Sequence, residues 1–150
     1  MFVSTLGMLL VLASWVASLQ SVDKLVDDSY SYDPIRPDGI QYDSDWMNDT
    51  HPSGPTRYNN TFHWTNTPQA KLIYFFQGNV IYYYADKDPS SAPISIALDS
   101  APEEIVDATA PSPQGQQLIW SKADLGSGDH QLVITHNGTS SQYLRLDYLR

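Results

Sequence analysis

Residues 126–136 read Gly-Ser-Gly-Asp-His-Gln-Leu-Val-Ile-Thr-His, and residues 143–149 read Tyr-Leu-Arg-Leu-Asp-Tyr-Leu. Apolar side chains recur there at every second position, which is the spacing that places them on one face of a pleated strand. Both stretches are therefore predicted to be strands that follow a glycine-rich turn and close an all-β sandwich. The residues expected on the core face are Leu132, Ile134, Leu144, Leu146 and Tyr148.

The rest of the chain predicts further strands, about 8–9 in all. The strongest pair is residues 70–76 and 80–84, which flank Gln77-Gly78-Asn79 and are predicted to form a hairpin. No window has helical periodicity, and Pro and Gly interrupt the chain too often for long helices. The other predicted strands are residues 25–28, 40–46, 58–64, 94–99 and 117–121, and residues 30–39 and 47–57 are predicted to be loops.

The first 18 residues carry no charged side chain and contain a near-continuous apolar run. The run is shorter than the ~20 residues that a membrane-spanning helix needs, and Val16-Ala17-Ser18 supplies small residues for cleavage. We therefore expect a signal peptide at 1–18, a single domain at 22–150, and a secreted, extracellular product without membrane insertion. An uncleaved anchor is the alternative, because the segment lacks the basic residues that usually begin a signal peptide.

Composition excludes several classes of partner and chemistry. The chain has 8 Lys and Arg against 17 Asp and Glu, a formal net charge of -9, and no cysteine. Such an acidic surface repels nucleic acid and anionic lipid, so neither is expected as a partner. Without cysteine the fold has no disulfide, and thiol catalysis and cysteine-ligated zinc are excluded.

Three sequons for N-glycosylation agree with a secreted chain. Their acceptors are Asn48, Asn59 and Asn137, each followed by threonine two residues later. Each lies beside a predicted turn, where a glycan would face water. We therefore predict a glycoprotein.

Motifs along nearly the whole mature chain resemble a basidiomycete family of extracellular jelly-roll domains. The resemblance implies a galactose-binding-like jelly-roll fold and, by analogy, carbohydrate binding; the family's functions are largely unassigned. Members usually occur in tandem ahead of a transmembrane helix, whereas this chain has one domain and Ser100 where the family often has glycine. The matching motifs are Val26-Asp-Asp28, Ile40-x-Tyr42 with Trp46, Tyr58-Asn59 to Thr61 with His63 and Thr65, Phe76-x-Gly78, Ile81-x-Tyr83, Ile96-x-Leu98-Asp99, Leu118 to Trp120, Leu125 to Ile134, and Leu146-Asp147-Tyr148.

The resemblance also implies a structural calcium site. In calcium-bearing carbohydrate-binding modules of similar fold, an aspartate in the closing strand joins acidic residues of the first strand around the ion. Asp147 is predicted to point away from the core face of its strand, and Asp27 and Asp28 would supply the remaining carboxylates. The alternative is that Asp147 caps a turn or pairs with Arg145 or Arg150.

Sugar recognition needs exposed aromatic rings for stacking and polar groups that orient hydroxyls. Trp64 is the predicted stacking ring, because it lies in a polar run, His63 to Thr67, where the resembling domains usually carry a small residue. Tyr58, Asn66 and Asp45 are predicted to complete the ligand-binding cluster. Trp46 and Trp120 fall in phase with apolar neighbours and are predicted to be core residues.

The predicted hairpin also has an apolar second face, which carries Phe75, Tyr82 and Tyr84. A face exposed to water should be polar, so something is expected to cover this one. The cover is either the loop of residues 30–39 or a partner protein.

No nucleophile elbow, phosphate loop or zinc-protease motif occurs, and no catalytic residue is assigned. The adjacent pair Glu103-Glu104 is expected on a loop, solvated rather than arranged as the two acids of a glycosidase. We therefore expect a non-catalytic binding module for a polysaccharide or glycoprotein of the cell wall or matrix. The alternatives are a protein-interaction domain that uses the face of Phe75, Tyr82 and Tyr84, and a calcium-stabilised structural wall protein.

Overall fold

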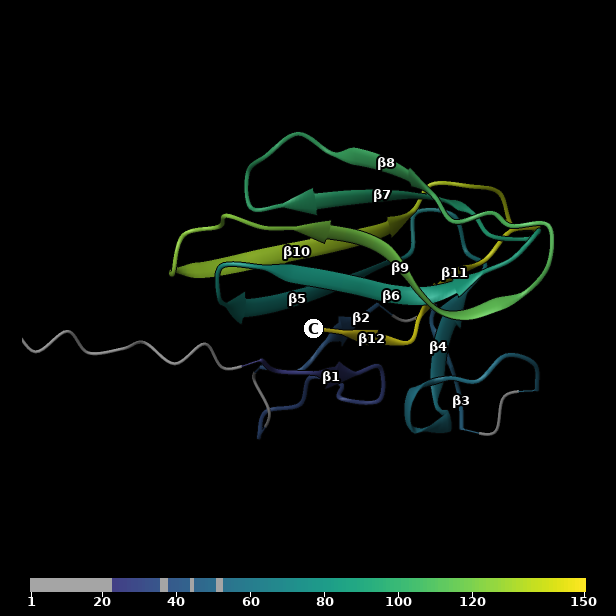
Figure 1. Ribbon diagram of the computed structural model, residues 1–150, viewed down its shortest axis with the longest axis horizontal. Coiled ribbons are helices and arrows are strands. Elements are labelled where there is room, and N and C mark those ends of the chain that lie inside the picture. The colour runs from purple at the N-terminus through teal and green to yellow at the C-terminus, as the bar shows by residue number, and fades with distance from the viewer. Residues whose placement is uncertain (1–22, 36–37, 44, 51–52) are drawn as a thin grey trace, which may run out of the picture.

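The computed structural model describes residues 23–35, 38–43, 45–50 and 53–150 (Figure 1). Regular structure in these residues consists of β-strands and one 3-10 turn, η1 (Tyr58–Asn60). No helix among them is long and apolar enough to cross a bilayer. The predicted signal peptide, residues 1–18, lies outside the described residues.

Two larger antiparallel sheets form a β-sandwich, as the alternating patterns predicted. A smaller sheet lies beside them, at the lower right of Figure 1. The first sheet has the order β1 (Val26–Asp27), β12 (Tyr148–Leu149), β6 (Ile81–Lys87), β9 (Gln114–Lys122). The second has the order β2 (Gln41–Tyr42), β5 (Lys71–Gln77), β10 (Asp129–His136), β7 (Pro93–Leu98), β8 (Glu104–Asp107). The third has the order β11 (Leu144–Leu146), β4 (Phe62–Thr65), β3 (Met47–Asp49).

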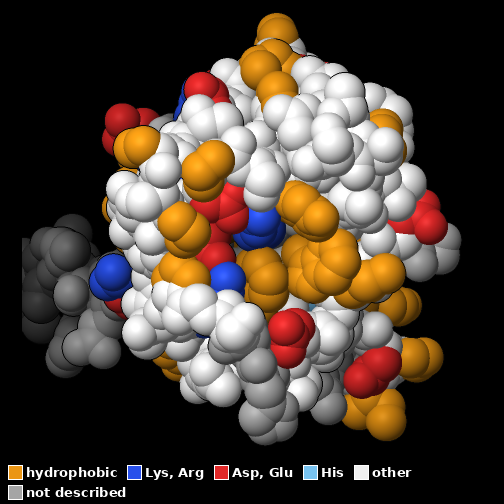
Figure 2. Space-filling view, turned by 90° about the vertical axis from the view of Figure 1, so that its right-hand side faces the viewer, with side chains coloured by type: hydrophobic (Ala, Val, Ile, Leu, Met, Phe, Trp, Pro, Cys, Tyr) orange, Lys and Arg blue, Asp and Glu red, His pale blue; other side chains and the backbone are white. Residues whose placement is uncertain are grey.

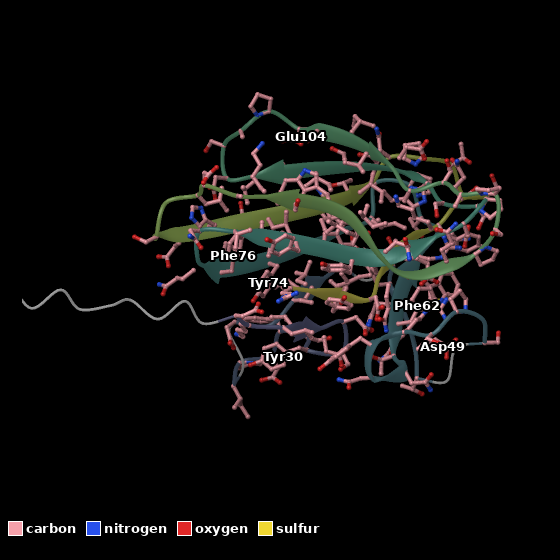
Figure 3. All side chains as sticks on the ribbon, in the orientation of Figure 1. Tyr30, Asp49, Phe62, Tyr74, Phe76 and Glu104 are labelled. Carbon is pink, nitrogen blue, oxygen red and sulfur yellow. The ribbon has the colours of Figure 1, made fainter. Side chains whose placement is uncertain are left out.

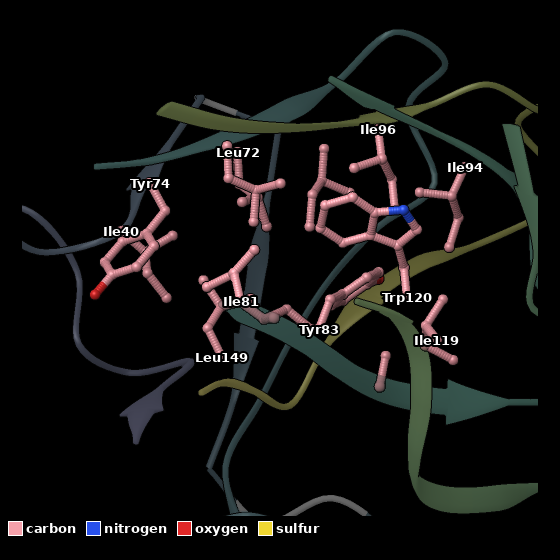
Figure 4. Packing of buried hydrophobic residues seen from close by; sticks show 14 of the residues in the cluster. Ile40, Leu72, Tyr74, Ile81, Tyr83, Ile94, Ile96, Ile119, Trp120 and Leu149 are labelled. Atoms are coloured by element: carbon pink, nitrogen blue, oxygen red, sulfur yellow. The ribbon is translucent and has the colours of Figure 1, made fainter. Parts of the chain in front are cut away.

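The core lies between the two larger sheets and is built by period-two alternation (Figure 4). Leu132 and Ile134 of β10 stand directly opposite Tyr74 and Leu72 of β5, and all four are buried. The other sheet contributes buried residues from β6 and β9, and among these Trp120 is 8% exposed. The predicted core residues of the closing strand 130–136 and the predicted burial of Trp120 are thus confirmed.

The predicted hairpin of residues 70–84 is wrong. β5 and β6 follow one another through Gly78, but β5 pairs with β2 and β10 whereas β6 pairs with β12 and β9. The connection therefore crosses from one sheet to the other. Each strand has an inward apolar face, which sequence periodicity detects, but a short turn does not itself require the two flanking strands to pair.

Residues 143–149 were predicted to form one final strand, but this strand is interrupted at Asp147 and divided into β11 and β12. β11 pairs with β4, β12 pairs with β6 and β1, and the face that is buried changes between them. Leu149 is fully buried and Tyr148 is partly exposed, the reverse of the predicted phase. Asp147 was predicted to point away from the core, but it is completely buried.

Three shorter segments also differ from expectation. Residues 104–107 form the edge strand β8 rather than a loop, and Glu104 there accepts a hydrogen bond from the Trp120 indole at 2.9 Å. Residues 47–49 form β3 inside a predicted loop. The strand predicted at 58–64 begins only at Phe62, because Asn59 and Asn60 adopt positive φ angles of 48° and 58°. Short strands such as these bring the described residues to twelve strands, against the 8–9 expected.

Candidate functional site

One face of the three-stranded sheet carries a row of large side chains. Met47, Trp64 and Arg145 occupy directly paired positions on β3, β4 and β11, so their side chains project from the same face. Met47 is 55% exposed, and Trp64 and Arg145 are partly exposed. The alternating positions of β4 and β11 face the interior and are buried: His63, Thr65, Leu144 and Leu146.

Trp64 forms an aromatic corner with Tyr143, which lies two residues before Arg145. Their ring centroids are 5.5 Å apart and their planes meet at 66°. The Arg145 guanidinium lies 5.0 Å from the Tyr143 centroid, within the range of a cation–π contact. Trp64, the predicted stacking ring, thus lies against a second ring and beside a cation, and its contact with a sugar stays a prediction.

Arg145 is held by three neighbours from the turn after β6. Its guanidinium donates to Ser90 Oγ at 3.0 Å and Ser91 Oγ at 3.1 Å, and it forms an ion pair with Asp88 at 2.8 Å. Burial lowers the pKa of Arg145, and Asp88 and Asp86 oppose that effect. The planar guanidinium of Arg145, whose N–H donors form a fork, is thereby fixed in one orientation.

A second Arg–Asp pair lies beside the first. The Arg57 guanidinium covers the Phe62 ring at 4.0 Å and pairs with Asp86, and the side chains of Arg57 and Asp86 are only 6% and 3% exposed. Phe62 precedes Trp64 by two positions on β4, so it shares the same face of the sheet. Burial raises the pKa of Asp86, although the Arg57 charge opposes the shift.

Figure 2 views the end of the molecule at which β3, β4 and β11 lie. Hydrophobic side chains there surround a hollow that holds basic and acidic side chains. Arg57, Arg145, Asp86 and Asp88 interact with one another electrostatically, and their charges balance. The arrangement offers aromatic surface together with oriented donors and acceptors, without excess charge of either sign.

The other predicted ligand residues are distributed along the neighbouring loops. Asn66 follows β4 and donates through Nδ2 to the Ser140 carbonyl at 3.2 Å. Tyr58 packs its ring against Tyr148, 5.5 Å between centroids. Asp45 is exposed, and its backbone N–H donates to Asp43. Trp64 on β4 and Asn66 just after it thus lie close together along the chain, whereas the Tyr58 ring packs against Tyr148 of a different sheet.

The strands that carry the predicted calcium ligands are adjacent, since the Asp28 N–H donates to the Asp147 carbonyl at 3.0 Å. Their side chains are engaged by protein groups. Asp28 contacts His63 Nδ1 at 2.7 Å and accepts from Thr61 Oγ1 at 2.6 Å, and Asp27 accepts from Thr61 and from Asn59 at 3.1 Å. Within the described ranges, no group of three or more His, Cys, Asp or Glu side chains is suited to a metal ion. Calcium binding stays a prediction.

Asp147 instead accepts the backbone N–H of Tyr58, the first residue of η1, at 2.8 Å. This contact agrees with the capping alternative, whereas Arg145 and Arg150 pair with Asp88 and Asp23. Its other oxygen, Oδ2, has no hydrogen-bond partner among the residues described. Burial raises the pKa of Asp147 to about 7; the Tyr58 N–H lowers it, and the carboxylates of Asp28 and Asp86 add to the rise.

The predicted partner face is divided between the two large sheets. Phe75 projects outward from β5 and is 44% exposed, whereas Tyr82 and Tyr84 project outward from β6. Tyr84 stacks on Tyr148 with 4.5 Å between ring centroids. The three residues do not form one flat face, but all three border a single cavity at the end of the sandwich opposite η1 and β3.

The three sequon asparagines are exposed. Asn48 lies on the edge strand β3, Asn59 in η1, and Asn137 directly after β10. Their exposure is compatible with glycosylation, which stays a prediction.

Sequence reasoning missed most of the polar part of the site. Arg145 could have been found, because it alternates with the buried Leu144 and Leu146 and therefore points to the opposite face. Arg57 and Asp88 lie in or beside loops with no periodicity, and only the folded chain brings them to β4 and β11.

Comparisons with known proteins connect the chain to carbohydrate-active enzymes. No protein-family model matches the sequence. An A type blood alpha-D-galactosamine galactosaminidase from Flavonifractor plautii is 25% identical over 114 residues, which are 73% of this chain and 10% of that protein. A family two carbohydrate esterase from Cellvibrio japonicus has a similar structure, with a TM-score of 0.56 and 17% identity over 84% of this chain and 32% of the esterase chain. The structural likeness shows a shared sandwich fold, and the sequence likeness shows a distant relation to a carbohydrate-active enzyme.

Proposed function

We propose that this chain is a secreted, non-catalytic carbohydrate-binding module of the galactose-binding-like jelly-roll type. Its glycan site is the outward face of β3, β4 and β11. The observation that carries the proposal is the corner of Trp64 and Tyr143 beside the fixed Arg145–Asp88 pair. In the galactosaminidase and the esterase described above, the matching part is a fraction of an enzyme that acts on carbohydrates, which supports a carbohydrate-related module.

The chemistry of this face suits a neutral sugar. An aromatic ring packs against the apolar C–H face of a pyranose, and the second ring at 66° limits how the sugar can turn. Arg145 donates and Asp88 accepts, so together they can bind neighbouring hydroxyls. Because the charges of the site balance and the whole chain carries -9, an acidic glycan would be repelled by the surrounding surface.

The proposal is tested by titrating the purified, secreted protein with neutral oligosaccharides and by probing a glycan array. Trp64→Ala should abolish array binding or weaken it roughly tenfold or more, because stacking area and orientation are both lost. Tyr32→Ala is the matched control, since Tyr32 is an aromatic side chain that is 47% exposed elsewhere on the surface. Equal binding by both variants and the parent would refute this site.

A protein-interaction domain is the second candidate, and it is favoured by one observation. Phe75 is a large apolar side chain that is 44% exposed on the outer side of the second sheet. If no glycan binds the parent protein, a protein partner of that surface becomes the working hypothesis, and Phe75→Ala is the variant that tests it.

A further inference from the structure

A second candidate site lies at the end of the sandwich away from β3 and β4. There a cavity of about 1120 Å³ is bordered by residues 23–24, by the C-terminal residues 149–150, and by the β5–β6 connection. Figure 3 shows Tyr74 and Phe76 at this end and Phe62 and Asp49 at the other. The volume slightly exceeds the roughly 300–1,000 Å³ that is usual for ligand sites, so there is room for a ligand larger than a single sugar.

Aromatic side chains from both sheets line this cavity. Tyr74 and Phe76 of β5 have nearly parallel rings 6.0 Å apart, and Tyr82 and Tyr84 come from β6. Phe75 borders the rim. Tyr74 is almost fully buried, whereas Phe76, Tyr82 and Tyr84 are partly exposed and offer ring surface to a ligand.

Polar residues line the same cavity. Gln77 ends β5, Asn79 belongs to the β5–β6 connection, and Asp129 begins β10. Gln77 Nε2 donates to Asp129 Oδ1 at 2.6 Å, which orients both side chains along the cavity wall. The side-chain amides of Gln77 and Asn79 can donate to and accept from sugar hydroxyls, and the Asp129 carboxylate can accept from them.

The charges at the mouth argue against an anionic ligand. Lys24 forms an ion pair with Asp38 at 3.0 Å, and Arg150 forms one with Asp23 at 2.5 Å. Each basic side chain that lines the cavity is thus neutralised by a carboxylate that lines it too, and Asp129 leaves the wall with a negative balance. A phosphate or uronate would meet repulsion here, whereas a neutral polyol would not.

We propose that this cavity is a second carbohydrate site, which binds a neutral oligosaccharide independently of the Trp64 face. The ligand class rests on the proposed function, but the location rests on separate residues. With sites at opposite ends, one domain bridges two glycan chains. Where both sites bind chains of the same polysaccharide network, the second binding event becomes intramolecular, and the effective affinity rises far above that of either site alone.

The test is calorimetric stoichiometry on the full secreted protein with laminarihexaose, cellohexaose, chitohexaose and N-acetylgalactosamine as probes. The variants are Trp64→Ala, Tyr82→Ala, Phe75→Ala and the double change Trp64→Ala with Tyr82→Ala. Thermal melting of each variant checks that it is folded. We expect two molecules of an oligosaccharide per parent chain, one in Trp64→Ala, one in Tyr82→Ala, and none in the double variant.

The outcomes separate this inference from the proposed function. A single site that is lost in Trp64→Ala but kept in both Tyr82→Ala and Phe75→Ala overturns the second site and leaves the first standing. Binding that survives Trp64→Ala but drops roughly tenfold or more in Tyr82→Ala or Phe75→Ala supports the second site and overturns the first. No binding of any probe by the parent protein overturns both.

Discussion

Trp64 and Arg145 are directly paired positions on the neighbouring strands β4 and β11, and the Arg145 guanidinium forms an ion pair with Asp88. The pairing places a stacking ring and a hydrogen-bonding fork side by side on a rigid sheet rather than on loops. A site built on strands holds its geometry more tightly than one built on loops. For glycan binding, the position of the Arg145 guanidinium should therefore matter as much as its charge.

Replacing Arg145 by lysine tests that claim. Arg145→Lys keeps the charge but loses the fork that contacts Ser90, Ser91 and Asp88, so we expect unfolding free energy to fall by about 1–3 kcal/mol. Glycan affinity should drop roughly tenfold. Urea denaturation and calorimetry measure the two effects. Lys122→Ala is the control, because its exposed ion pair with Glu104 contributes at most about 1 kcal/mol. A lysine variant with parental affinity would show that the fork does not contact the ligand.

The buried pair of Arg57 and Asp86 predicts a strong non-additivity. Arg57→Met alone leaves the Asp86 carboxylate buried without its partner, which should lower the unfolding free energy by about 3–5 kcal/mol. The double variant Arg57→Met with Asp86→Leu removes both charges and should recover most of that loss. Urea melts of Arg57→Met, Asp86→Leu and the double variant measure the coupling between the two charges. Additive losses would show that the two charges do not depend on each other.

Asp147 predicts a pH dependence of stability. Its pKa is raised to about 7 by burial, so the folded protein holds a proton that the unfolded chain has released. This group therefore lowers stability as pH rises from about 4 to about 7, and the loss is complete above that range. Asp147→Asn keeps an acceptor for the Tyr58 N–H and has no charge to bury, so it should be more stable than the parent at pH 8 by on the order of 2–4 kcal/mol.

Denaturant melts at pH 5 and pH 8 check this prediction. The advantage of Asp147→Asn over the parent should be clearly smaller at pH 5 than at pH 8, because only the first part of the loss has occurred at pH 5. Asp45→Asn, at an exposed carboxylate, should change neither value. The idea fails if Asp147→Asn is the less stable protein at pH 8.

Chelation tests the predicted calcium site separately. Asp28 and Asp147 use most of their oxygens on His63, Thr61 and Tyr58, so we expect EDTA to leave the melting midpoint unchanged. An ion bound only by the native state raises the midpoint, and the rise grows with the logarithm of the ion concentration above Kd. A midpoint that rises with added calcium and falls with EDTA would instead support the predicted ion.

The sandwich class and much of its core were predictable from the sequence. Leu132, Ile134 and Trp120 are buried as their spacing indicated, because alternation along a strand depends only on the backbone geometry of that strand. Part of the candidate site was predictable for a related reason. Trp64 interrupts a polar run, and a large ring in such a place is unusual enough to attract attention.

The pairing of strands was not predictable in the same way. β5 and β6 each have one apolar face, and either a hairpin or a crossing between sheets would bury both faces equally well. Likewise, Asp147 looked like an outward residue because its neighbours alternate, but the chain changes sheets at that point. Backbone hydrogen bonds are the same for any partner strand, so the sequence carries little information about the choice.

By itself, the sequence determined the all-β class, the position of most of the longer strands, which faces of those strands are apolar, and that the domain carries a large negative charge. Only the tertiary structure decided that Arg57 pairs with Asp86, that Arg145 lies beside Trp64, and that the buried carboxyl of Asp147 interacts with those of Asp28 and Asp86. The physical reason is that local patterns reflect each residue's preference for water or for the interior. Contacts between residues 29–89 positions apart depend instead on how all the strands pack at once.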